Sequence, residues 1–375
     1  MKIVIDENVA FAEEAFSKFG EVRLLHGREI DQSVLKNTDA LIVRSITKIN
    51  KELLEGTSVT FVGTATIGTD HVDLEYLNER SIGFADAKGC NADAVAEYVF
   101  TALFSAAVKK NISLKDKTIG VVGVGNIGSR IVKLAEAYGL KVLMNDPPRQ
   151  KKESSSDFVS LEEILTADII TIHTPLTYEG NDKTFHLINR KHLEQLKEGA
   201  IFINAARGEV VDNTALSDML DEKMITAVLD VWESEPNIDR ELVNKVLFST
   251  PHVAGYSLEG KFNGTKMMVA AMNKFFNKNI LWQPQLPEFE NSEIIVNSAS
   301  SKEELLSSIF NKIYNIEEDS KPLKTFSGDK ESLGKCFDLL RKEYPLRREF
   351  TNYSIKANAF PEELAKFLQA LRFNL

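Results

Sequence analysis

Three side chains suited to acid–base chemistry on an anionic substrate each follow a short apolar run in the second half of the chain: Arg207, Glu235 and His252. Histidine is the base best matched to neutral pH. A glutamate can accept the second ring N–H of such a histidine, and an arginine can grip a carboxylate with a planar fork of donors. His252 alone would be interpreted as a hydrogen-bonded core residue, but the three together indicate a catalytic site.

The apolar runs predict parallel strands over residues 168–172, 200–203, 226–229 and 246–248, and Thr174 and Asp230 also follow their ends. In an open α/β sheet, ligands bind outside the carboxyl ends of the strands. Packing gives no reason to place an arginine, a glutamate and a histidine at neighbouring strand ends, whereas a functional site does.

An earlier stretch, Gly120–Gly128, has the spacing of a dinucleotide-binding loop. A predicted buried strand leads into Gly123-x-Gly125-x-x-Gly128, and a helical pattern follows from Asn126. In such a loop the first glycine permits the tight turn, the second lets the backbone approach a pyrophosphate, and the third lets helix and strand pack closely. The N–H groups at the helix start attract the phosphate.

A second predicted strand, residues 141–144, ends just before Asp146. A carboxylate at this place can accept both hydroxyls of an adenosine ribose and would repel a 2′-phosphate. Because strand, loop, helix, strand and acid occur in this order, a plain βαβ unit is the weaker interpretation. We predict an NAD site, with NAD favoured over NADP, followed by an exposed polar loop over residues 149–157.

The chain has 375 residues, which predicts two or three domains, and its net charge of −10 argues against a nucleic-acid or membrane-surface binder. Cys90 and Cys336 cannot form a disulfide framework. A strand predicted directly after Met1 leaves no signal peptide, and no apolar run reaches membrane length. We therefore expect a cytoplasmic protein. The histidines other than His252 show no metal-ligand spacing, so no metal site is predicted.

Short strands and helices alternate in the first 90 residues, as in a small parallel α/β domain. A nearly uncharged helix that Asn91 could cap follows, and a later helix over residues 256–278 returns to the first domain. A proline-containing linker, residues 282–290, precedes an α+β segment with predicted strands over residues 293–297 and 353–356.

The predicted architecture is α/β with three parts. A flavodoxin-like substrate domain, residues 1–92 and 256–284, is split around an inserted Rossmann NAD-binding domain, residues 93–255. A C-terminal α+β module, residues 285–375, follows.

Strand ends of the first domain also carry polar residues, among them Arg44, Ser45 and the stretch Gly63–Asp70. Loops rich in glycine and threonine can direct several N–H groups at an anion. Ordinary turn chemistry and a solvated Arg44 explain the same residues about equally well.

In combination, these motifs resemble the D-isomer-specific 2-hydroxyacid dehydrogenases. The resemblance rests on the glycine-rich loop, residues 204–212, Asp230-x-x-x-x-Glu235-Pro236 and Pro251-His252. That family has a catalytic domain split around an NAD domain, which matches the first 280 residues. Residues 43–48, Asp146-Pro-Pro-Arg149 and the C-terminal module are similar to one branch of the family, which oxidises a phosphorylated four-carbon hydroxyacid in bacterial vitamin B6 (pyridoxal 5′-phosphate) synthesis.

The resemblance implies an NAD-dependent oxidoreductase in which His252 receives the hydroxyl proton, Glu235 stabilises the imidazolium and Arg207 polarises the new carbonyl. It places the phosphorylated substrate against Arg44, Ser45, Thr66, Arg207 and Tyr256. It places the cofactor against Gly123, Gly125, Asn126, Ile127, Gly128, Asp146, Thr174, Ala206, Asp230 and Gly255.

Alternatives to this function stay open. Another D-2-hydroxyacid, such as 3-phosphoglycerate or glycerate, is the enzymatic rival, and an NAD-sensing binding protein of the same fold is the non-catalytic one. The C-terminal module is predicted to form a homodimer, with Arg347 or Arg348 near the partner's active site. A solvated charge pair on a strand edge explains these two arginines at least as well.

Overall fold

The computed structural model describes residues 1–284, 286–287, 289, 292–296, 300–356 and 360–375. It contains two compact units, Met1–Asn91 with Ser257–Glu288 and Ala92–Tyr256 with Phe289–Leu375. Each unit is built on a parallel sheet, so the predicted α/β fold class is confirmed. Within these described ranges, no helix combines the length and the apolar character needed to cross a membrane.

The first unit has a five-stranded parallel sheet of order β2-β1-β3-β4-β5, which is the flavodoxin-like arrangement. Its strands are β1 (Lys2–Asp6), β2 (Glu21–Leu25), β3 (Ala40–Val43), β4 (Phe61–Thr64) and β5 (Gly83–Asp86). Successive side chains of β1 enter different cores, since Ile3 and Ile5 pack with Phe16 and Met272, whereas Val4 packs with Leu35.

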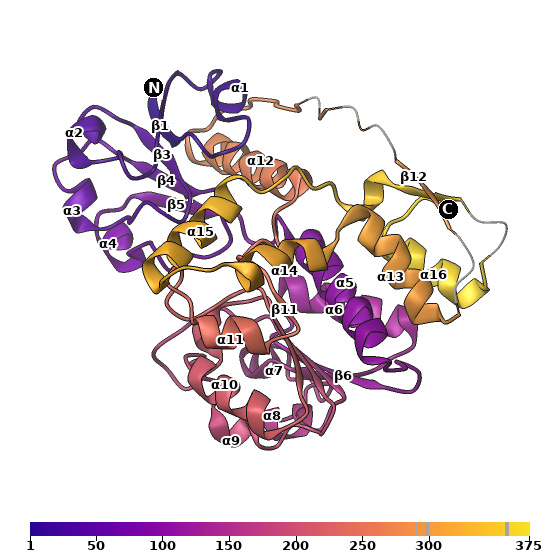
Figure 1. Cartoon of the computed structure of the whole chain (residues 1–375). Coiled ribbons are helices and arrows are strands. Elements are labelled where there is room, and N and C mark those ends of the chain that lie inside the picture. Colours follow the sequence, from indigo (N-terminus) through magenta and orange to yellow (C-terminus); the bar gives the residue numbers. More distant parts are fainter. Residues whose placement is uncertain (285, 288, 290–291, 297–299, 357–359) are drawn as a thin grey trace. The chain divides into compact units, whose positions relative to one another are not determined.

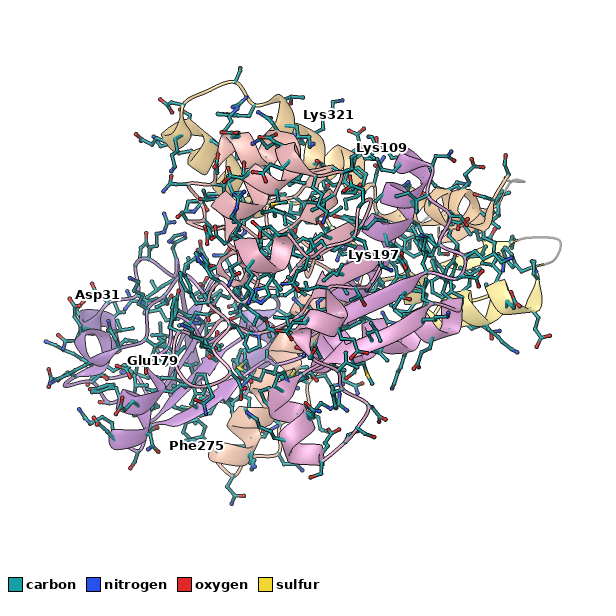
Figure 2. All side chains as sticks on the ribbon, turned by 90° about the horizontal axis from the view of Figure 1, so that it is seen from below. Asp31, Lys109, Glu179, Lys197, Phe275 and Lys321 are labelled. Atoms are coloured by element: carbon teal, nitrogen blue, oxygen red, sulfur yellow. The ribbon has the colours of Figure 1, made fainter. Side chains whose placement is uncertain are left out.

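Helices cover both faces of this first sheet. Those on one face are α1 (Ala12–Phe16) and α12 (Leu258–Phe275), and those on the other are α2 (Gln32–Leu35), α3 (Lys51–Leu54) and α4 (Leu74–Glu79) (Figure 1). The short helices depend on their caps: Asp31, labelled in Figure 2, accepts the N–H groups of Ser33 and Val34 at 2.8 and 3.2 Å at the start of α2.

The second unit has a six-stranded parallel sheet of order β11-β10-β9-β8-β6-β7. Its strands are β6 (Thr118–Val122), β7 (Lys141–Asn145), β8 (Ile169–Ile172), β9 (Ile201–Asn204), β10 (Thr226–Leu229) and β11 (Phe248–Ser249). Ile201 and Ile203 of β9 enter the core under α5 (Ala92–Lys110) and α6 (Asn126–Tyr138). Phe202 enters the opposite core, to which α8 (Leu161–Ile164), α9 (Arg190–Leu193), α10 (Asn213–Glu222) and α11 (Arg240–Lys245) contribute. Both faces are covered, as a parallel sheet requires.

The C-terminal residues belong to the same compact unit and share its core. Helix α13 (Lys302–Ile313) lies along α5 and α16 (Glu362–Ala370) lies along α6 (Figure 1). Phe104 of α5 meets the rings of Phe310 and Phe367 with centroids 5.6 and 5.8 Å apart. The remaining elements are α14 (Ile316–Thr325), α15 (Lys330–Lys342) and the parallel pair β12 (Glu293–Ile295) and β13 (Ser354–Lys356). The division of this unit into separate NAD-binding and C-terminal domains stays a prediction.

Several local expectations are wrong. Of the polar residues predicted as an exposed loop, 149–153 instead belong to helix α7 (Pro147–Glu153), which has prolines in its first turn and Asp146 as its cap, whereas 154–157 lie beyond the helix. No described residue donates to Asn91 Oδ1, so Asn91 does not cap α5 through that atom. Trp282 is only 7% exposed and donates to Glu14 at 3.1 Å, so the expected linker begins within the core of the first unit. Residues 285, 288 and 290 of that linker, and residue 297 of an expected strand, lie outside the described residues.

Candidate active site

The carboxyl ends of four neighbouring strands meet at one edge of the sheet in the second unit. The ladder aligns the last residues of β8, β9, β10 and β11. Thr174, Arg207, Asp230 and His252 follow these ends within a few residues. The structure therefore gathers at one edge the side chains that the sequence places at separate strand ends.

His252 and Glu235 form a hydrogen-bonded pair at this edge. His252 Nδ1 lies 2.7 Å from Glu235 Oε2, and Glu235 Oε1 accepts the N–H of Trp232 at 2.9 Å. Burial acts to raise the pKa of Glu235, but the neighbouring His252 imidazole and the Arg341 guanidinium outweigh it, so this pKa lies below its ordinary value. The ionised carboxylate can stabilise an imidazolium. No described residue is hydrogen-bonded to His252 Nε2, which leaves that nitrogen available for proton exchange.

Asp230 holds the loop that carries His252. Its buried carboxylate accepts the Thr250 hydroxyl at 2.6 Å and the N–H groups of Val253 and Ala254 at 2.8 and 2.9 Å, and its carbonyl accepts the N–H of His252 at 2.7 Å. His252 has a φ of 58°, a left-handed conformation that persists only where the surroundings impose it. Hydrogen bonds to one buried residue supply that constraint. The predicted contact of Asp230 with the cofactor stays a prediction.

Arg207 follows β9 in a loop that Asn204 shapes. The Asn204 side chain accepts the N–H of Ala206 at 3.1 Å and donates to the Arg207 carbonyl at 2.9 Å, and Arg207 Nη1 donates to the Ala206 carbonyl at 2.7 Å. A Cβ at Gly208 would lie 1.9 Å from the carbonyl carbon of Trp232. Only glycine permits this backbone contact, which joins the Arg207 loop to the loop that leads to Glu235.

Two further carboxylates lie near Glu235, and the sequence analysis missed both. Burial raises the pKa of Glu209, and the charges of Glu235 and Glu233 raise it further, while Arg207 opposes the shift. Glu233 is hydrogen-bonded to His186 Nε2. The residues next to these two glutamates in the sequence give no sign that either differs from an ordinary solvent-exposed glutamate.

A cation also lies near the pair, and it comes from the C-terminal residues. The guanidinium carbon of Arg341 lies 5.9 Å from the ring centre of Tyr256 and 5.7 Å from that of Phe337. Its charge interacts with Glu235. The sequence analysis missed this residue because it belongs to a segment remote from all the recognised motifs.

Two glycines of the dinucleotide loop, Gly123 and Gly128, have the structural roles predicted for them. Gly123 has a φ of +85°, and a Cβ there would lie 2.7 Å from the backbone of His173. A Cβ at Gly128 would lie 2.0 Å from the Gly123 carbonyl oxygen, so this glycine permits the contact between strand and helix. Gly125 has no described atom within 4 Å of its Cβ position, which leaves its backbone open to a ligand at the start of α6.

Asp146 lies beside this loop. Its Oδ2 accepts the N–H of Val124 at 2.9 Å, and its Oδ1 accepts the N–H of Arg149 at 3.0 Å. The Arg149 guanidinium donates to the Val124 carbonyl at 2.6 Å and to the Ser129 hydroxyl at 3.2 Å. The acid therefore keeps the position expected for a ribose contact, with an arginine directly beside it.

The remaining predicted cofactor residues surround the same edge. Asn126 and Ile127 begin α6, whereas Ala206 and Gly255 lie in the loops after β9 and β11. Thr174 Oγ1 is buried, and no described residue is its hydrogen-bond partner. A buried hydroxyl without a protein partner calls for a partner from elsewhere. The open backbone at Gly125 and this hydroxyl both fit a bound dinucleotide.

In the first unit, Arg44, Ser45 and Thr66 follow the adjacent strands β3 and β4. Arg44 Nη1 lies 3.3 Å from the Asn8 carbonyl, and Ser45 is exposed. Burial lowers the pKa of Lys261, and the charge of Arg44 lowers it further. Two cationic side chains therefore gather in this unit, of which the sequence analysis recognised one.

Arg347 and Arg348 are both buried, each 6% exposed. Arg347 Nη2 donates to the carbonyls of Ala254 at 2.5 Å and Ala94 at 3.3 Å, and Arg348 Nη2 donates to Asn352 Oδ1 at 2.6 Å. The interpretation as a solvated charge pair is therefore wrong, and neither guanidinium extends from the surface of its unit. Acceptors inside the unit offset the cost of burying these charges.

The described part of the chain contains no group of three or more histidine, cysteine, aspartate or glutamate side chains arranged to hold a metal ion.

The sequence of this chain is similar to two protein-family models and to named dehydrogenases. Residues 92–254 match the model described as "D-isomer specific 2-hydroxyacid dehydrogenase, NAD binding domain", and residues 285–371 match a "Domain of unknown function (DUF3410)". A protein of Proteus mirabilis named erythronate-4-phosphate dehydrogenase is 44% identical over 100% of this chain and 99% of its own length.

Solved structures of dehydrogenases are also similar. The D-lactate dehydrogenase of Aquifex aeolicus, complexed with NAD and lactic acid, is 26% identical with a TM-score of 0.61, covering 74% of this chain and 96% of that one. The NAD+-bound 3-phosphoglycerate dehydrogenase of Entamoeba histolytica is 27% identical with a TM-score of 0.64, covering 74% of this chain and 95% of that one.

Proposed function

This chain belongs to the D-isomer-specific 2-hydroxyacid dehydrogenase family, and we propose that it oxidises 4-phospho-D-erythronate with NAD to 2-oxo-3-hydroxy-4-phosphobutanoate, in the synthesis of pyridoxal 5′-phosphate (vitamin B6). The observation that carries the proposal is the 2.7 Å His252–Glu235 pair at the strand edge that also bears Arg207. The choice of substrate is supported by the Proteus mirabilis relative, whose similarity includes the C-terminal residues.

The chemistry divides between the cofactor and three side chains. Oxidation of a secondary alcohol beside a carboxylate removes a hydride from carbon and a proton from oxygen, and NAD, when bound, is the hydride acceptor. His252 takes the proton through Nε2, the ring nitrogen that Glu235 does not hold. Glu235 fixes the tautomer and stabilises the imidazolium. Arg207 binds the substrate carboxylate and polarises the carbonyl as it forms.

The cofactor is held, in this proposal, by the glycine-rich loop and the strand edge. The backbone at Gly125, Asn126 and Ile127 binds the pyrophosphate, because it is open and lies at the start of α6. Asp146 binds the adenosine ribose, and the buried Thr174 hydroxyl bonds to the cofactor. Ala206, Asp230 and Gly255 contribute the remaining contacts.

The substrate phosphate requires positive charge, and the first unit provides it. Arg44 and Lys261 are close enough for the charge of one to lower the pKa of the other, after the effect of burial. Two cations close to one another favour the binding of a dianion. We assign Arg44, Ser45 and Thr66 to substrate binding on this basis, with Tyr256 as a further contact.

Two other functions make different predictions. A dehydrogenase for 3-phosphoglycerate would prefer the three-carbon substrate. An NAD-sensing binding protein would bind NADH tightly without rapid turnover, and the His252–Glu235 pair with a free Nε2 favours catalysis over this alternative.

A homodimer and a cytoplasmic location are further parts of the proposal. The side chains of Ile295, Leu339 and Leu346, all from the C-terminal residues, are 67%, 50% and 63% exposed. An interface made by this segment would remove such apolar side chains from water. Light scattering of the purified protein would show twice the mass of the chain if the homodimer forms, and a monomer would contradict it.

The functional proposal is tested by mixing the protein with NAD and either 4-phospho-D-erythronate or 3-phosphoglycerate and following the absorbance of NADH. Rapid NADH formation with the four-carbon phosphate, abolished by His252→Ala, is expected. Preference for 3-phosphoglycerate would overturn the choice of substrate. Tight NADH binding without turnover on either compound would favour the sensor.

A further inference from the structure

The C-terminal segment from Arg341 to Arg347 touches the active-site loop at three points. The Arg341 guanidinium lies over the Tyr256 ring, 5.9 Å from its centre. The ring of Tyr344 meets the same ring edge to face, with centroids 5.7 Å apart and an interplanar angle of 83°. Arg347 Nη2 donates to the carbonyl of Ala254 at 2.5 Å. Two residues of the loop that follows His252 are thus held by side chains from a distant part of the sequence.

Each of these side chains is itself fixed by the C-terminal residues. Tyr344 donates its hydroxyl to Asp319 Oδ2 at 2.6 Å, and the Arg347 guanidinium lies 4.6 Å from the centre of the Tyr314 ring. Arg341 also contacts the ring of Phe337, one turn earlier in α15. The segment therefore meets the loop as a rigid support, not as three mobile surface chains.

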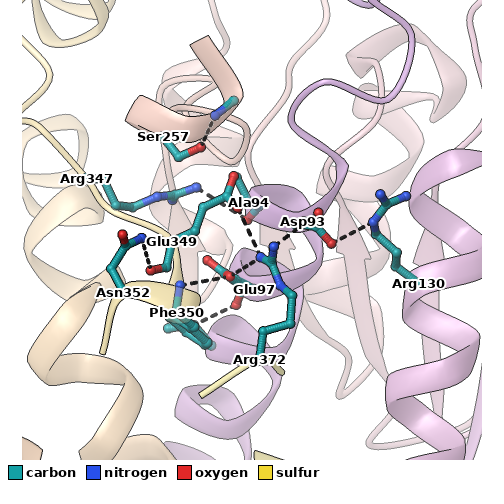
Figure 3. A network of polar contacts seen from close by, with 12 residues as sticks. Asp93, Ala94, Glu97, Arg130, Ser257, Arg347, Glu349, Phe350, Asn352 and Arg372 are labelled. Atoms are coloured by element: carbon teal, nitrogen blue, oxygen red, sulfur yellow. Dashed lines mark hydrogen bonds and ion pairs between the residues drawn. The ribbon is translucent and has the colours of Figure 1, made fainter. Parts of the chain in front are cut away.

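A polar network fastens this support to the NAD-binding elements (Figure 3). Arg372 binds Glu97 of α5 at 2.8 Å, Glu349 at 3.0 Å and Asp93 at 3.3 Å. Glu97 also accepts the N–H of Phe350 at 2.9 Å. Glu97 is only 5% exposed, so these contacts are buried. They hold Glu349 and Phe350, which follow Arg347 closely in the sequence, against helix α5.

Arg341 also contributes charge at the catalytic pair. Both oxygens of Glu235 already have partners, His252 Nδ1 and the N–H of Trp232. Arg341 lies over the ring of Tyr256, four residues beyond His252 in the sequence, and its positive charge lowers the pKa of the Glu235 carboxyl group. The charges of Arg207, Glu233 and Glu235 act on Glu209, and the charge of Asp230 acts on Arg341. Arg341 and Arg207 therefore oppose several acids.

We propose that residues 341–347 are a positioning element for the active-site loop, and that Arg341 fixes the Tyr256 ring and sets the charge balance at the His252–Glu235 pair. Arg341 acts through these residues and is a positioning residue, not a catalytic one. The inference rests on the proposed dehydrogenase function and extends it to the C-terminal residues, which match a family model without an assigned function.

A positive charge near the catalytic pair affects the pH dependence of the reaction. A nearby cation disfavours every protonated form of the His252–Glu235 pair, since protonation adds positive charge. Loss of the cation should therefore require a higher pH to reach the state in which His252 can accept a proton. The acid limb of kcat/KM for alcohol oxidation should move to higher pH. A residue that only supports the fold would lower the amount of active enzyme and leave the position of this limb unchanged.

The experiment compares Arg341→Met, Arg341→Lys and Lys342→Met in the full-length protein, with wild-type turnover measured first. Lys342 is the matched control because it is the next residue of α15, exposed and positively charged. For each variant, kcat, KM, the pH profile of kcat/KM and the dissociation constant of NADH are measured.

Arg341→Met should lower kcat/KM about 10- to 100-fold and move the acid limb up by roughly half a pH unit or more, with NADH affinity retained. Arg341→Lys keeps the charge but loses the planar stack, so it should lower kcat/KM while leaving the acid limb in place. Lys342→Met should match the wild type.

The proposal is overturned if Arg341→Met has wild-type kinetics and pH profile, or if it differs from Lys342→Met only by a lower fraction of folded protein. Should Arg341→Met fail to fold, the Lys variant decides: wild-type kcat/KM in Arg341→Lys would refute the role of the planar contact with Tyr256. Absence of turnover in the wild type would instead refute the proposed function.

Discussion

Replacement of Glu235 by glutamine tests the catalytic pair with little change of shape. The amide oxygen can still accept the N–H of Trp232, which donates to the native carboxylate at 2.9 Å. The amide NH2 group then faces His252 Nδ1, where the native carboxylate oxygen lies at 2.7 Å. The substitution therefore removes the negative charge and replaces the acceptor that holds the Nδ1–H tautomer by a donor. The imidazolium that forms when His252 takes the substrate proton then loses its counter-ion.

The size of the effect follows from the separation and burial of the pair. Two unit charges about 4 Å apart interact by about 4 kcal/mol at an effective dielectric constant of about 20. The Glu235 side chain is 19% exposed, so solvent screening is limited. The substitution of this charge and acceptor is therefore expected to cost at least about 2.7 kcal/mol, which corresponds to a fall in kcat of about 100-fold or more.

The assay is steady-state NADH formation across a range of pH, with Glu233→Gln as the control. Glu233 lies two residues away in the sequence and binds His186, so its loss removes a negative charge from the same loop but keeps the hydrogen bond between Glu235 and His252. Glu235→Gln should move the acid limb of kcat/KM to lower pH, because the imidazolium is no longer stabilised. A fall in kcat of less than about threefold, or an equal fall in the two variants, would refute the reasoning.

Three further predictions concern the cofactor loop and the C-terminal network. Gly125→Ala should fold with an unchanged Tm but bind NADH weakly, because its new Cβ lies in open space. Gly128→Ala should lower the Tm, because its new Cβ would lie 2.0 Å from the Gly123 carbonyl oxygen. Equal Tm values for the two variants would contradict this. Asp146→Ser should shift the preference from NADH toward NADPH in titrations, because Arg149 already lies beside that position. Burial and the Glu349 charge raise the pKa of Glu97 from 4.5 to about 8. Between these two pH values, Glu97 therefore keeps a proton in the folded state that it has lost in the unfolded state. Unfolding free energies should therefore fall as pH rises, by up to about 1.4 kcal/mol per pH unit, and Glu97→Gln should flatten this slope.

The strand edge could be predicted from the sequence because its elements are locally encoded. Short apolar runs such as Ile169–Ile172 and Thr226–Leu229 are each followed by a polar stretch, and parallel strands must present these ends on one side. The dinucleotide loop could be predicted for the same reason. Gly123 and Gly128 lie so close to other backbone atoms that only glycine fits there. Whether each site residue contacts its predicted ligand stays a prediction.

The parts that the sequence did not reveal depend on contacts between distant segments. Arg347 and Arg348 have the composition of a surface pair, and acceptors such as the carbonyls of Ala94 and Ala254 and the side chain of Asn352 make their burial possible. Arg341 stands in an amphipathic helix whose other basic residues face solvent. Composition indicates exposure in both cases, and the acceptors that reverse it come from elsewhere in the chain.

The helix after Asp146 was not predicted because this residue has two possible roles. Asp146 was predicted as a ribose contact, yet it also caps α7 by accepting the N–H of Arg149. A polar segment after proline residues was therefore predicted as a loop when it forms a helix.

The most direct test of the central claim follows the hydride itself. The protein is incubated with NAD and 4-phospho-D-erythronate deuterated at C2, and the mass of the reduced cofactor is measured. We predict that the NADH formed carries one deuterium and that its formation is lost with His252→Ala. Reduced cofactor without deuterium, or no reduced cofactor despite bound NAD, would contradict oxidation at the carbon beside the carboxylate.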